Sequence, residues 1–202
     1  MRFKPDHSEK TKATIVAVAS RRFRRDGFNG VGVDGVASEA GMTSGVIYSQ
    51  FGSKTKLFAA VLRAGLEELR KSLSEMDGQD ALFTYLDTYF SAEHRSDPEN
   101  GCLLPCLSID AGRSGPDAQA AFGEVLPQVI DEMERLLIAT GADSDRDSVL
   151  ATLALMTGGI MLARALPDED AAQEMLNACC KVAKEQICMP KATVRRRKQG
   201  KG

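Results

Sequence analysis

The 202-residue sequence has no tryptophan, only two histidines, and five cysteines, an odd number. His7 and His94 lie far apart and no Cys/His cluster has zinc-site spacing, so we expect no metal and no cofactor. Cysteines without a regular spacing are typical of reduced thiols in the cytoplasm. No run approaches the roughly 18 apolar residues of a membrane span, and the stretch MRFKPDHSEK lacks a secretory apolar core. We therefore expect a cytoplasmic protein with no membrane partner.

Motifs of the common enzyme classes are also missing. The sequence has no Gly-x-Ser-x-Gly, no Walker loop and no His-Glu-x-x-His, so we expect no catalytic residues. Residues 30–35 have the form G-x-G-x-x-G, but they follow a helical pattern where a dinucleotide-binding loop requires a strand. We interpret these glycines as a turn between the first two helices. An all-helical enzyme or scaffold remains the non-regulatory alternative.

Charge is distributed unevenly along the chain, although the net charge is only -2. Residues 1–56 hold ten Lys or Arg against five Asp or Glu, residues 57–188 hold ten against twenty-three, and residues 189–202 hold six basic residues and no acid. A basic N-terminal part joined to an acidic body is typical of a protein that binds a polyanion with one domain. The simpler explanation is that solvated helix faces differ in charge.

Apolar periodicity predicts an all-α fold. The pattern repeats every three to four residues, and no alternating strand pattern appears. Beyond two short helices between residues 33 and 51, we predict longer helices at Ser8–Asp26, Lys54–Met76, Asp80–His94, Leu103–Ala111, Asp117–Thr140, Asp145–Leu166 and Asp168–Ile187. From residue 190 the chain has almost no core-forming residue, and we predict a disordered basic tail at 190–202.

The segment between Val33 and Lys54 carries the most specific pattern. It reads VDGVASEAGMTSGVIYSQFGSK, two short helical patterns separated by Gly41. The first places an apolar stripe at i, i+3, i+4 and i+7, and Gly41 supplies the backbone freedom that ends a helix. Thr43 is a good N-cap for the second, whose first turn carries only small side chains. Such a helix can approach a DNA major groove closely, so we interpret the segment as a helix-turn-helix.

This segment resembles the DNA-binding domain of the TetR family of transcriptional regulators. The resemblance starts near Ser8 and covers roughly a quarter of the chain. It includes Phe-x-x-x-Gly-aromatic from Phe23 to Phe28 and Ala-Gly at the end of the second helix. It continues with Ser/Thr-x-Gly-x-x-Tyr-x-x-Phe, and then with Ser-Lys and Leu. The matching residues of these last two motifs are Thr43, Gly45, Tyr48, Phe51, Ser53, Lys54 and Leu57. Gly32 and Gln50 depart from it, since many members have Ser or Thr and an aromatic ring there.

The resemblance implies a ligand-responsive regulator, a repressor, that binds double-stranded DNA as a homodimer. We expect Tyr48 and Lys54 to contact phosphates, and a few of the other residues of this helix to contact base edges. The predicted DNA-binding residues are Thr43, Ser44, Gly45, Val46, Tyr48, Ser49, Gln50 and Lys54. The arginines at the end of the first helix, residues 21, 22, 24 and 25, form a possible supporting phosphate surface, although the helix dipole alone favours cations there.

The resemblance also implies a two-domain arrangement. A three-helix DNA-binding domain would occupy residues 1–53, and a six-helix ligand-binding and dimerisation domain residues 54–189. Dimerisation would use Asp145–Leu166 and Asp168–Ile187 of each subunit. Gly158 and Gly159 interrupt the apolar first of these, and a glycine pair inside a helix favours a close helix crossing. We expect that crossing at the subunit interface, with a contact inside one chain as the alternative.

A small-molecule ligand would occupy the helical body. The candidate pocket residues are Phe83, Tyr89, Phe90, Cys106 and Phe122, with Tyr85 as a further aromatic of the same helices, although aromatic residues at helical spacing also suit an ordinary core. Cys102 and Cys106 lie four residues apart and share a face if the helix covers both. They suggest an alternative function, a redox- or electrophile-sensing repressor, while the simpler interpretation is two small buried hydrophobic residues.

Overall fold

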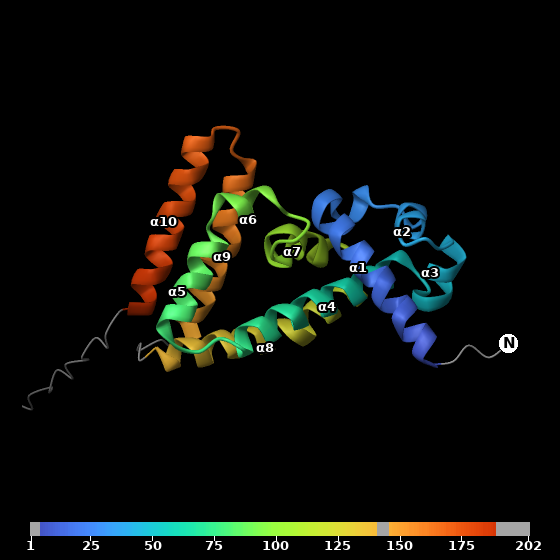
Figure 1. The fold of residues 1–202 in the computed structure, drawn as a ribbon, viewed down its shortest axis with the longest axis horizontal. Helices are drawn as coiled ribbons and strands as arrows, with labels where there is room; N and C mark the ends of the chain where they lie inside the picture. Colours follow the sequence, from blue (N-terminus) through green and yellow to red (C-terminus); the bar gives the residue numbers. More distant parts are fainter. Residues whose placement is uncertain (1–4, 141–145, 189–202) are drawn as a thin grey trace, which may run out of the picture.

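The computed structural model describes residues 5–140 and 146–188, and all of its regular elements in these ranges are helices (Figure 1). The all-α prediction is confirmed for this part of the chain. The described helices are α1 (Pro5–Gly30), α2 (Val33–Glu39), α3 (Ser44–Phe51), α4 (Lys54–Ser74), α5 (Gly78–Tyr89), α6 (Ala92–Ser96), α7 (Leu103–Arg113), α8 (Pro116–Ala139), α9 (Arg146–Ala165) and α10 (Glu169–Cys188). The predicted tail at 190–202 lies outside the described residues.

Helices α1–α3 form a compact head at one end of the molecule (Figure 1). Phe23 of α1 is fully buried, and its ring lies 5.0 Å from the ring of Phe58, at the start of α4, and 6.0 Å from that of Phe28. Val36 and Ile47, one from each short helix, complete the core. This packing of apolar stripes from three short helices holds α3 at the surface.

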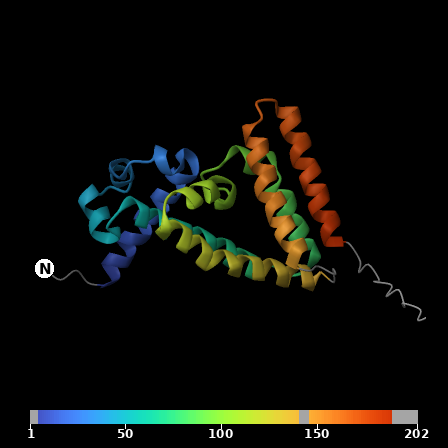
Figure 2. The same cartoon turned by 180° about the vertical axis from the view of Figure 1, so that it is seen from behind.

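The body consists of two groups of helices. Helices α4 and α8 run side by side along one edge, and α5, α9 and α10 stand together at the far end of that pair (Figures 1 and 2). Helix α7 lies between the head and the body and contacts α1 as well as α4, α8 and α9. The head is therefore joined to the body through both α4 and α7.

The segment predicted as one helix, Asp80–His94, consists of two, so this prediction was wrong. Helix α5 ends at Tyr89, and α6 starts at Ala92 with Ser91 as its N-cap. The Ser91 side chain accepts a hydrogen bond from the backbone N–H of His94 at 3.1 Å. A serine that caps a new helix competes with continuation of the old one, and apolar periodicity does not reveal it.

The first helix also differs from the prediction near its end. Gly27 has φ +70°, outside the helical region, yet residues 28–30 form a further helical turn. The backbone N–H of Phe28 donates to Asp110 Oδ2 of α7 at 2.6 Å. A Cβ at position 27 would lie 3.2 Å from that same oxygen. Glycine therefore provides both the positive φ and the space that the contact between head and α7 requires.

The two glycines of α9 have different surroundings. A Cβ at Gly159 would lie 2.8 Å from Cys179 Sγ of α10 and 3.2 Å from Phe90 Cε1, whereas nothing lies within 4 Å of a Cβ at Gly158. The close approach at Gly159 is a contact inside one chain, the alternative to the expected subunit interface.

By its length and composition alone, helix α9 could cross a membrane, and a third of its most apolar stretch is buried. Core helices of soluble proteins often have the same length and composition.

Candidate nucleic-acid interface and adjoining cavity

The turn between α2 and α3 has the geometry that the sequence predicts. The C-cap of α2 is Ala40, and Gly41 has φ +66°. The backbone N–H of Met42 returns to the carbonyl oxygen of Ala37 at 2.8 Å, as in a helix end closed by a left-handed residue. Thr43 then stands at the N-cap of α3 with an extended backbone. The two short helices are thereby held at a fixed angle.

The first turn of α3 presents small, accessible groups. Thr43 and Gly45 are exposed, and the Thr43 side chain makes no capping hydrogen bond. A Cβ at Gly45 would have only one ordinary contact, with Thr43 Oγ1 at 3.8 Å, so packing inside the chain does not require glycine there. The bare backbone at Gly45 suits close approach by another molecule. Ser44 is half-buried, and its hydroxyl donates to Asp34 of α2.

The remaining predicted residues of α3 divide into exposed and held side chains. Tyr48 is 51 % exposed and Ser49 is exposed, whereas Val46 is half-buried against the core. Gln50 is half-buried, and its Oε1 accepts a hydrogen bond from Ser8 Oγ of α1 at 3.2 Å. The Gln50 amide nitrogen has no hydrogen-bond partner among the described residues.

Lys54 lies apart from the exposed face of α3. Its Nζ stands 4.4 Å from the centroid of the Phe28 ring, a cation–π contact. Burial lowers the pKa of Lys54, and the nearby Asp110 carboxylate opposes that shift. The ammonium group is thus placed toward the contact between the head and α7.

The arginines at the end of α1 are engaged within the chain. Arg22 Nη1 donates to the carbonyl oxygen of Gly35 at 3.1 Å and to Glu39 at 3.3 Å, and Arg21 also pairs with Glu39. Arg25 bridges Asp26 and Glu99. These contacts connect α1 to α2 and to the loop before α7. They leave less unpaired positive charge on the head than its composition suggests.

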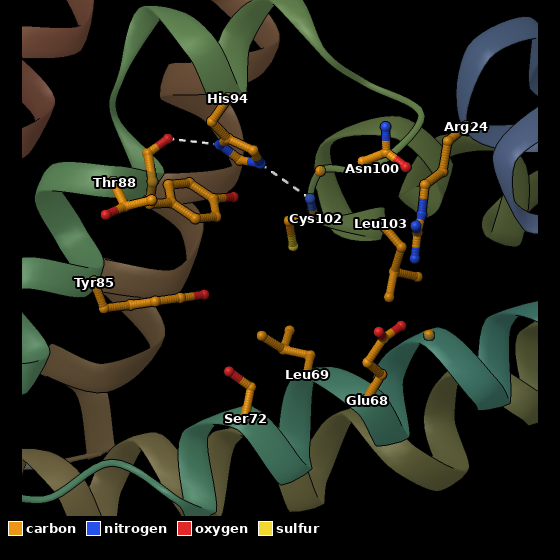
Figure 3. Close-up of a pocket in the computed structure, with 13 residues that line it drawn as sticks. Arg24, Glu68, Leu69, Ser72, Tyr85, Thr88, His94, Asn100, Cys102 and Leu103 are labelled. Atoms are coloured by element: carbon orange, nitrogen blue, oxygen red, sulfur yellow. Dashed lines mark hydrogen bonds between the residues drawn. The ribbon is translucent and has the colours of Figure 1, made fainter.

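A cavity of about 300 Å³ lies behind the head, between α1, α4, α5 and the loop before α7 (Figure 3). Leu69 and Leu103 give it apolar surface, and Arg24, Tyr85, Tyr89 and Cys102 also line it. The sequence provided no signal for Arg24 in a cavity, since it indicated this residue only as a helix-end cation or as part of a supporting phosphate surface. Its neighbours in the cavity are 41 or more positions away along the chain.

His94 supports one wall of this cavity. Its Nδ1 lies 2.6 Å from the carbonyl oxygen of Tyr89, and its Nε2 accepts a hydrogen bond from the Cys102 N–H at 3.0 Å (Figure 3). The neutral imidazole satisfies both contacts, with the proton on Nδ1. Burial lowers the pKa of His94, which keeps the ring neutral. Both nitrogens are therefore used in holding α5, α6 and α7 together.

The five residues predicted to form a ligand pocket do not lie together. Tyr89 lies on the wall of the cavity just described. Phe83 packs under Lys184 Nζ, Phe90 is buried near Gly159, and Phe122 packs on the core. Cys106 lies beside Arg164, whose Nη1 is 3.1 Å from Sγ. Pro105 falls in the first turn of α7, with Cys102 at its N-cap, so the helix accommodates both cysteines.

Comparison with known proteins identifies the head. Residues 15–61 match the family model described as bacterial regulatory proteins, tetR family. The head is therefore a TetR-family domain. This match covers α1 from Ile15 onward, α2, α3 and the start of α4, the part that holds the exposed first turn of α3.

Two curated relatives of this chain are regulators, matched over part of their length. The HTH-type transcriptional repressor SCO4008 of Streptomyces coelicolor is 38% identical over 65 residues, which cover 32% of this chain and 34% of the relative. The uncharacterized HTH-type transcriptional regulator YfiR of Bacillus subtilis is 26% identical over 84 residues, 42% of this chain and 41% of the relative. The chain spans less than half the length of either relative.

Solved structures agree with the fold over nearly the whole chain. The reduced form of E. coli NemR has a TM-score of 0.73 at 19% identity, covering 87% of this chain and 96% of that one. A TetR transcriptional regulator from Chloroflexus aurantiacus has a TM-score of 0.71 at 22% identity, covering 92% and 98%. At these identities the likeness concerns the fold of the head and the helical body.

Proposed function

We propose that this chain is a homodimeric transcriptional repressor of the TetR family that binds a near-palindromic DNA operator and is released by a small molecule. The observation that carries the proposal is the first turn of α3, where Thr43 and Gly45 are exposed and nothing inside the chain requires a glycine. In the bound state α3 enters a major groove. Two heads then contact half-sites about one helical turn, ~34–36 Å, apart. A head of residues 1–53 and a body of residues 54–189 divide these tasks.

Phosphate and base contacts are divided along α3. The exposed Tyr48 hydroxyl donates to a phosphate oxygen, and Thr43, Gly45 and Ser49 lie where the backbone or bases approach. Gln50 reaches a base edge with its amide nitrogen, because Ser8 already donates to its oxygen. Lys54 contributes general attraction for the phosphates close to Phe28. Ser44 and Val46 help to hold the turn and the helix in place.

Dimerisation through α9 and α10 is supported by their exposed apolar residues. Leu162 is 57 % exposed and Leu150 43 % on α9, and Val182 of α10 is 42 % exposed. Because α9 exposes these apolar side chains, the chain gains stability when a second copy covers them.

The small molecule occupies the cavity between α1, α4, α5 and α7. Its preference for one position of the head shifts the affinity for DNA.

The test starts with selection of bound fragments from random DNA, followed by titration of the selected sequence at several salt concentrations. We expect an inverted repeat and a steep loss of affinity with salt, since neutralised phosphates release counterions. Tyr48→Phe should weaken binding to all sequences alike, by about 0.5–1.5 kcal/mol. The matched control is Thr84→Val, which removes an exposed hydroxyl on α5 and should leave affinity unchanged.

Gln50→Ala tests the base contact separately. It should reduce discrimination at one base position by about 0.5–1.5 kcal/mol, since a single hydrogen bond from the amide nitrogen is lost. Equal losses on matched and mismatched sites would show that Gln50 does not contact a base. A monomer that ignores duplex DNA at low salt would contradict the whole proposal.

A second candidate is an electrophile-sensing repressor that uses Cys106 or Cys102. Burial raises the pKa of the Cys106 thiol, and Arg164, whose Nη1 lies 3.1 Å from Sγ, opposes that shift. Burial likewise raises the pKa of Cys102. NemR, a structural neighbour, was solved in a form named reduced. Iodoacetamide provides a test: Sγ bonds to carbon, iodide leaves, and the thiol proton passes to water. Equal DNA release in Cys106→Ser, Cys102→Ser and wild type would contradict this candidate.

A further inference from the structure

One wall of the cavity comes from the DNA-binding head. Arg24 belongs to α1, and its guanidinium reaches the space between α4 and α7 (Figure 3). Nη1 donates to the carbonyl oxygen of Glu99 at 3.3 Å, while the buried Nε has no hydrogen-bond partner among the described residues. Neighbouring Arg25, by contrast, is fully used by two carboxylates.

Gly65 of α4 creates the room in front of Arg24. A Cβ there would lie 3.3 Å from Arg24 Nη2 and 2.9 Å from Leu103 Cδ2. The missing side chain lets α4 approach α7 closely while the cavity still extends to the guanidinium. No salt bridge to Arg24 is found among the described residues. A half-buried guanidinium without a carboxylate is an attractive partner for a planar anion, which it can bind through two parallel hydrogen bonds.

The other end of the cavity is aromatic. The Tyr85 ring projects into the space with its hydroxyl toward the middle (Figure 3), and no hydrogen bond to that hydroxyl is found among the described residues. Burial raises the pKa of Tyr85, so the hydroxyl stays neutral. The rings of Tyr89 and His94, with centroids 4.7 Å apart, extend this wall. Such rings favour stacked or edge-on contact with another ring.

The charge at the mouth of the cavity does not reverse the preference for an anionic ligand. Glu68 is the acidic residue of the cavity lining, and it is exposed. Water screens an exposed carboxylate far more than a half-buried guanidinium. His94 contributes no charge, because both nitrogens are used and burial lowers its pKa. The inward field is therefore dominated by Arg24.

We propose that the cavity binds a small aromatic carboxylate, with its ring against Tyr85 and Tyr89 and its carboxylate held by Arg24, so that the ligand contacts the DNA-binding head directly. This inference rests on the proposed function and adds the ligand class and the residue that couples ligand to head. Since Arg24 moves with α1, ligand affinity and head position are linked in both directions.

The test measures binding of two probes of equal shape by calorimetry, without DNA. The probes are 2-naphthoate and its neutral counterpart 2-naphthamide. We expect wild type to bind the carboxylate about ten-fold more tightly, as charge-assisted hydrogen bonds allow. Arg24→Gln should remove this preference, and Arg24→Lys should keep part of it. Arg25→Gln is the matched control, one residue along and outside the cavity, and should keep the full preference.

Three results would overturn the inference: no binding of either probe, equal binding of both by wild type, or a carboxylate preference that survives in Arg24→Gln. Thermal unfolding reveals whether Arg24→Gln folds. If it does not, Arg24→Lys and the comparison of the two probes in wild type still test whether the cavity prefers a carboxylate. A separate DNA titration distinguishes this failure from that of the proposed function. 2-Naphthoate should change the DNA affinity of wild type and of Arg25→Gln, and 2-naphthamide at equal concentration should not. Loss of the probe preference with intact DNA binding would reject the ligand class alone.

Discussion

The head and the body of this molecule contrast in how completely they fill their interiors. In the head, the rings of Phe23, Phe28 and Phe58 pack against one another, and Phe23 and Phe58 are fully buried. The body borders a cavity into which Tyr85 projects, and the Tyr85 hydroxyl has no partner among the described residues. A closed interior suits a rigid surface, whereas unmet polar groups beside a void suit a ligand. The contrast suggests that recognition of DNA and response to a ligand place opposite demands on packing.

The largest effect should come from opening the core of the head. Phe23→Ala removes a fully buried ring and should lower the free energy of unfolding by about 3–5 kcal/mol. Chemical denaturation measures this change. Ile109→Ala, at a residue that is 48 % exposed on α7, is the control and should cost far less. Similar losses in both variants would show that the head is not tightly packed.

Next in size is the effect of a charge on the exposed face of α9. Leu162→Glu should weaken the proposed dimer by about 2 kcal/mol or more, since a leucine covered by a partner is replaced by a carboxylate. Analytical ultracentrifugation over a range of concentrations gives the dissociation constant. Ile109→Glu carries the same charge on α7 and should leave the dimer intact. Unchanged dimerisation in Leu162→Glu would move the interface to another face.

The two glycines of α9 provide a matched pair with a smaller effect. Gly159→Ala should be less stable than Gly158→Ala by about 1–3 kcal/mol, because its Cβ meets Cys179 Sγ at 2.8 Å whereas the Cβ at 158 meets nothing. Thermal and chemical unfolding of both variants give the difference. Equal stabilities would mean that α10 adjusts freely, and that the body is looser than its contacts indicate.

The smallest effect concerns His94 at the cavity wall. Burial holds its pKa below the ordinary value of 6.5, and Arg164 acts in the same direction, so the unfolded chain binds its proton first. Stability is therefore full above pH 6.5 and declines as the pH falls through the folded-state pKa. Denaturation at pH 7.5 and 5.5 should reveal this loss in wild type and a smaller one in His94→Gln. An identical decline in both would assign it to other groups.

The head was predictable because its signal is local. Gly41, Tyr48 and Phe51 stand at fixed spacings within one short segment, and the structure places the turn and α3 where that segment predicts. The break at Ser91 was missed because a single capping hydroxyl decides it. The cavity as a whole was unpredictable for a different reason: Arg24 and Tyr85 come to line opposite ends of one space only after α1, α4 and α5 have packed together. The predicted pocket residues, chosen as aromatic groups at helical spacing, mostly became core.

The bond between Phe28 and Asp110 has a mechanical consequence. The head is attached to the body through the continuous start of α4 and, on the other side, through α7 and the loop before it, by this bond and by the contacts of Arg24 and Arg25 with Glu99. When only one of two supports shifts, a rigid object pivots about the other. A displacement of α7 relative to α4 would therefore swing α3 through an arc, and a small movement near the cavity would become a larger one at the surface that faces the groove.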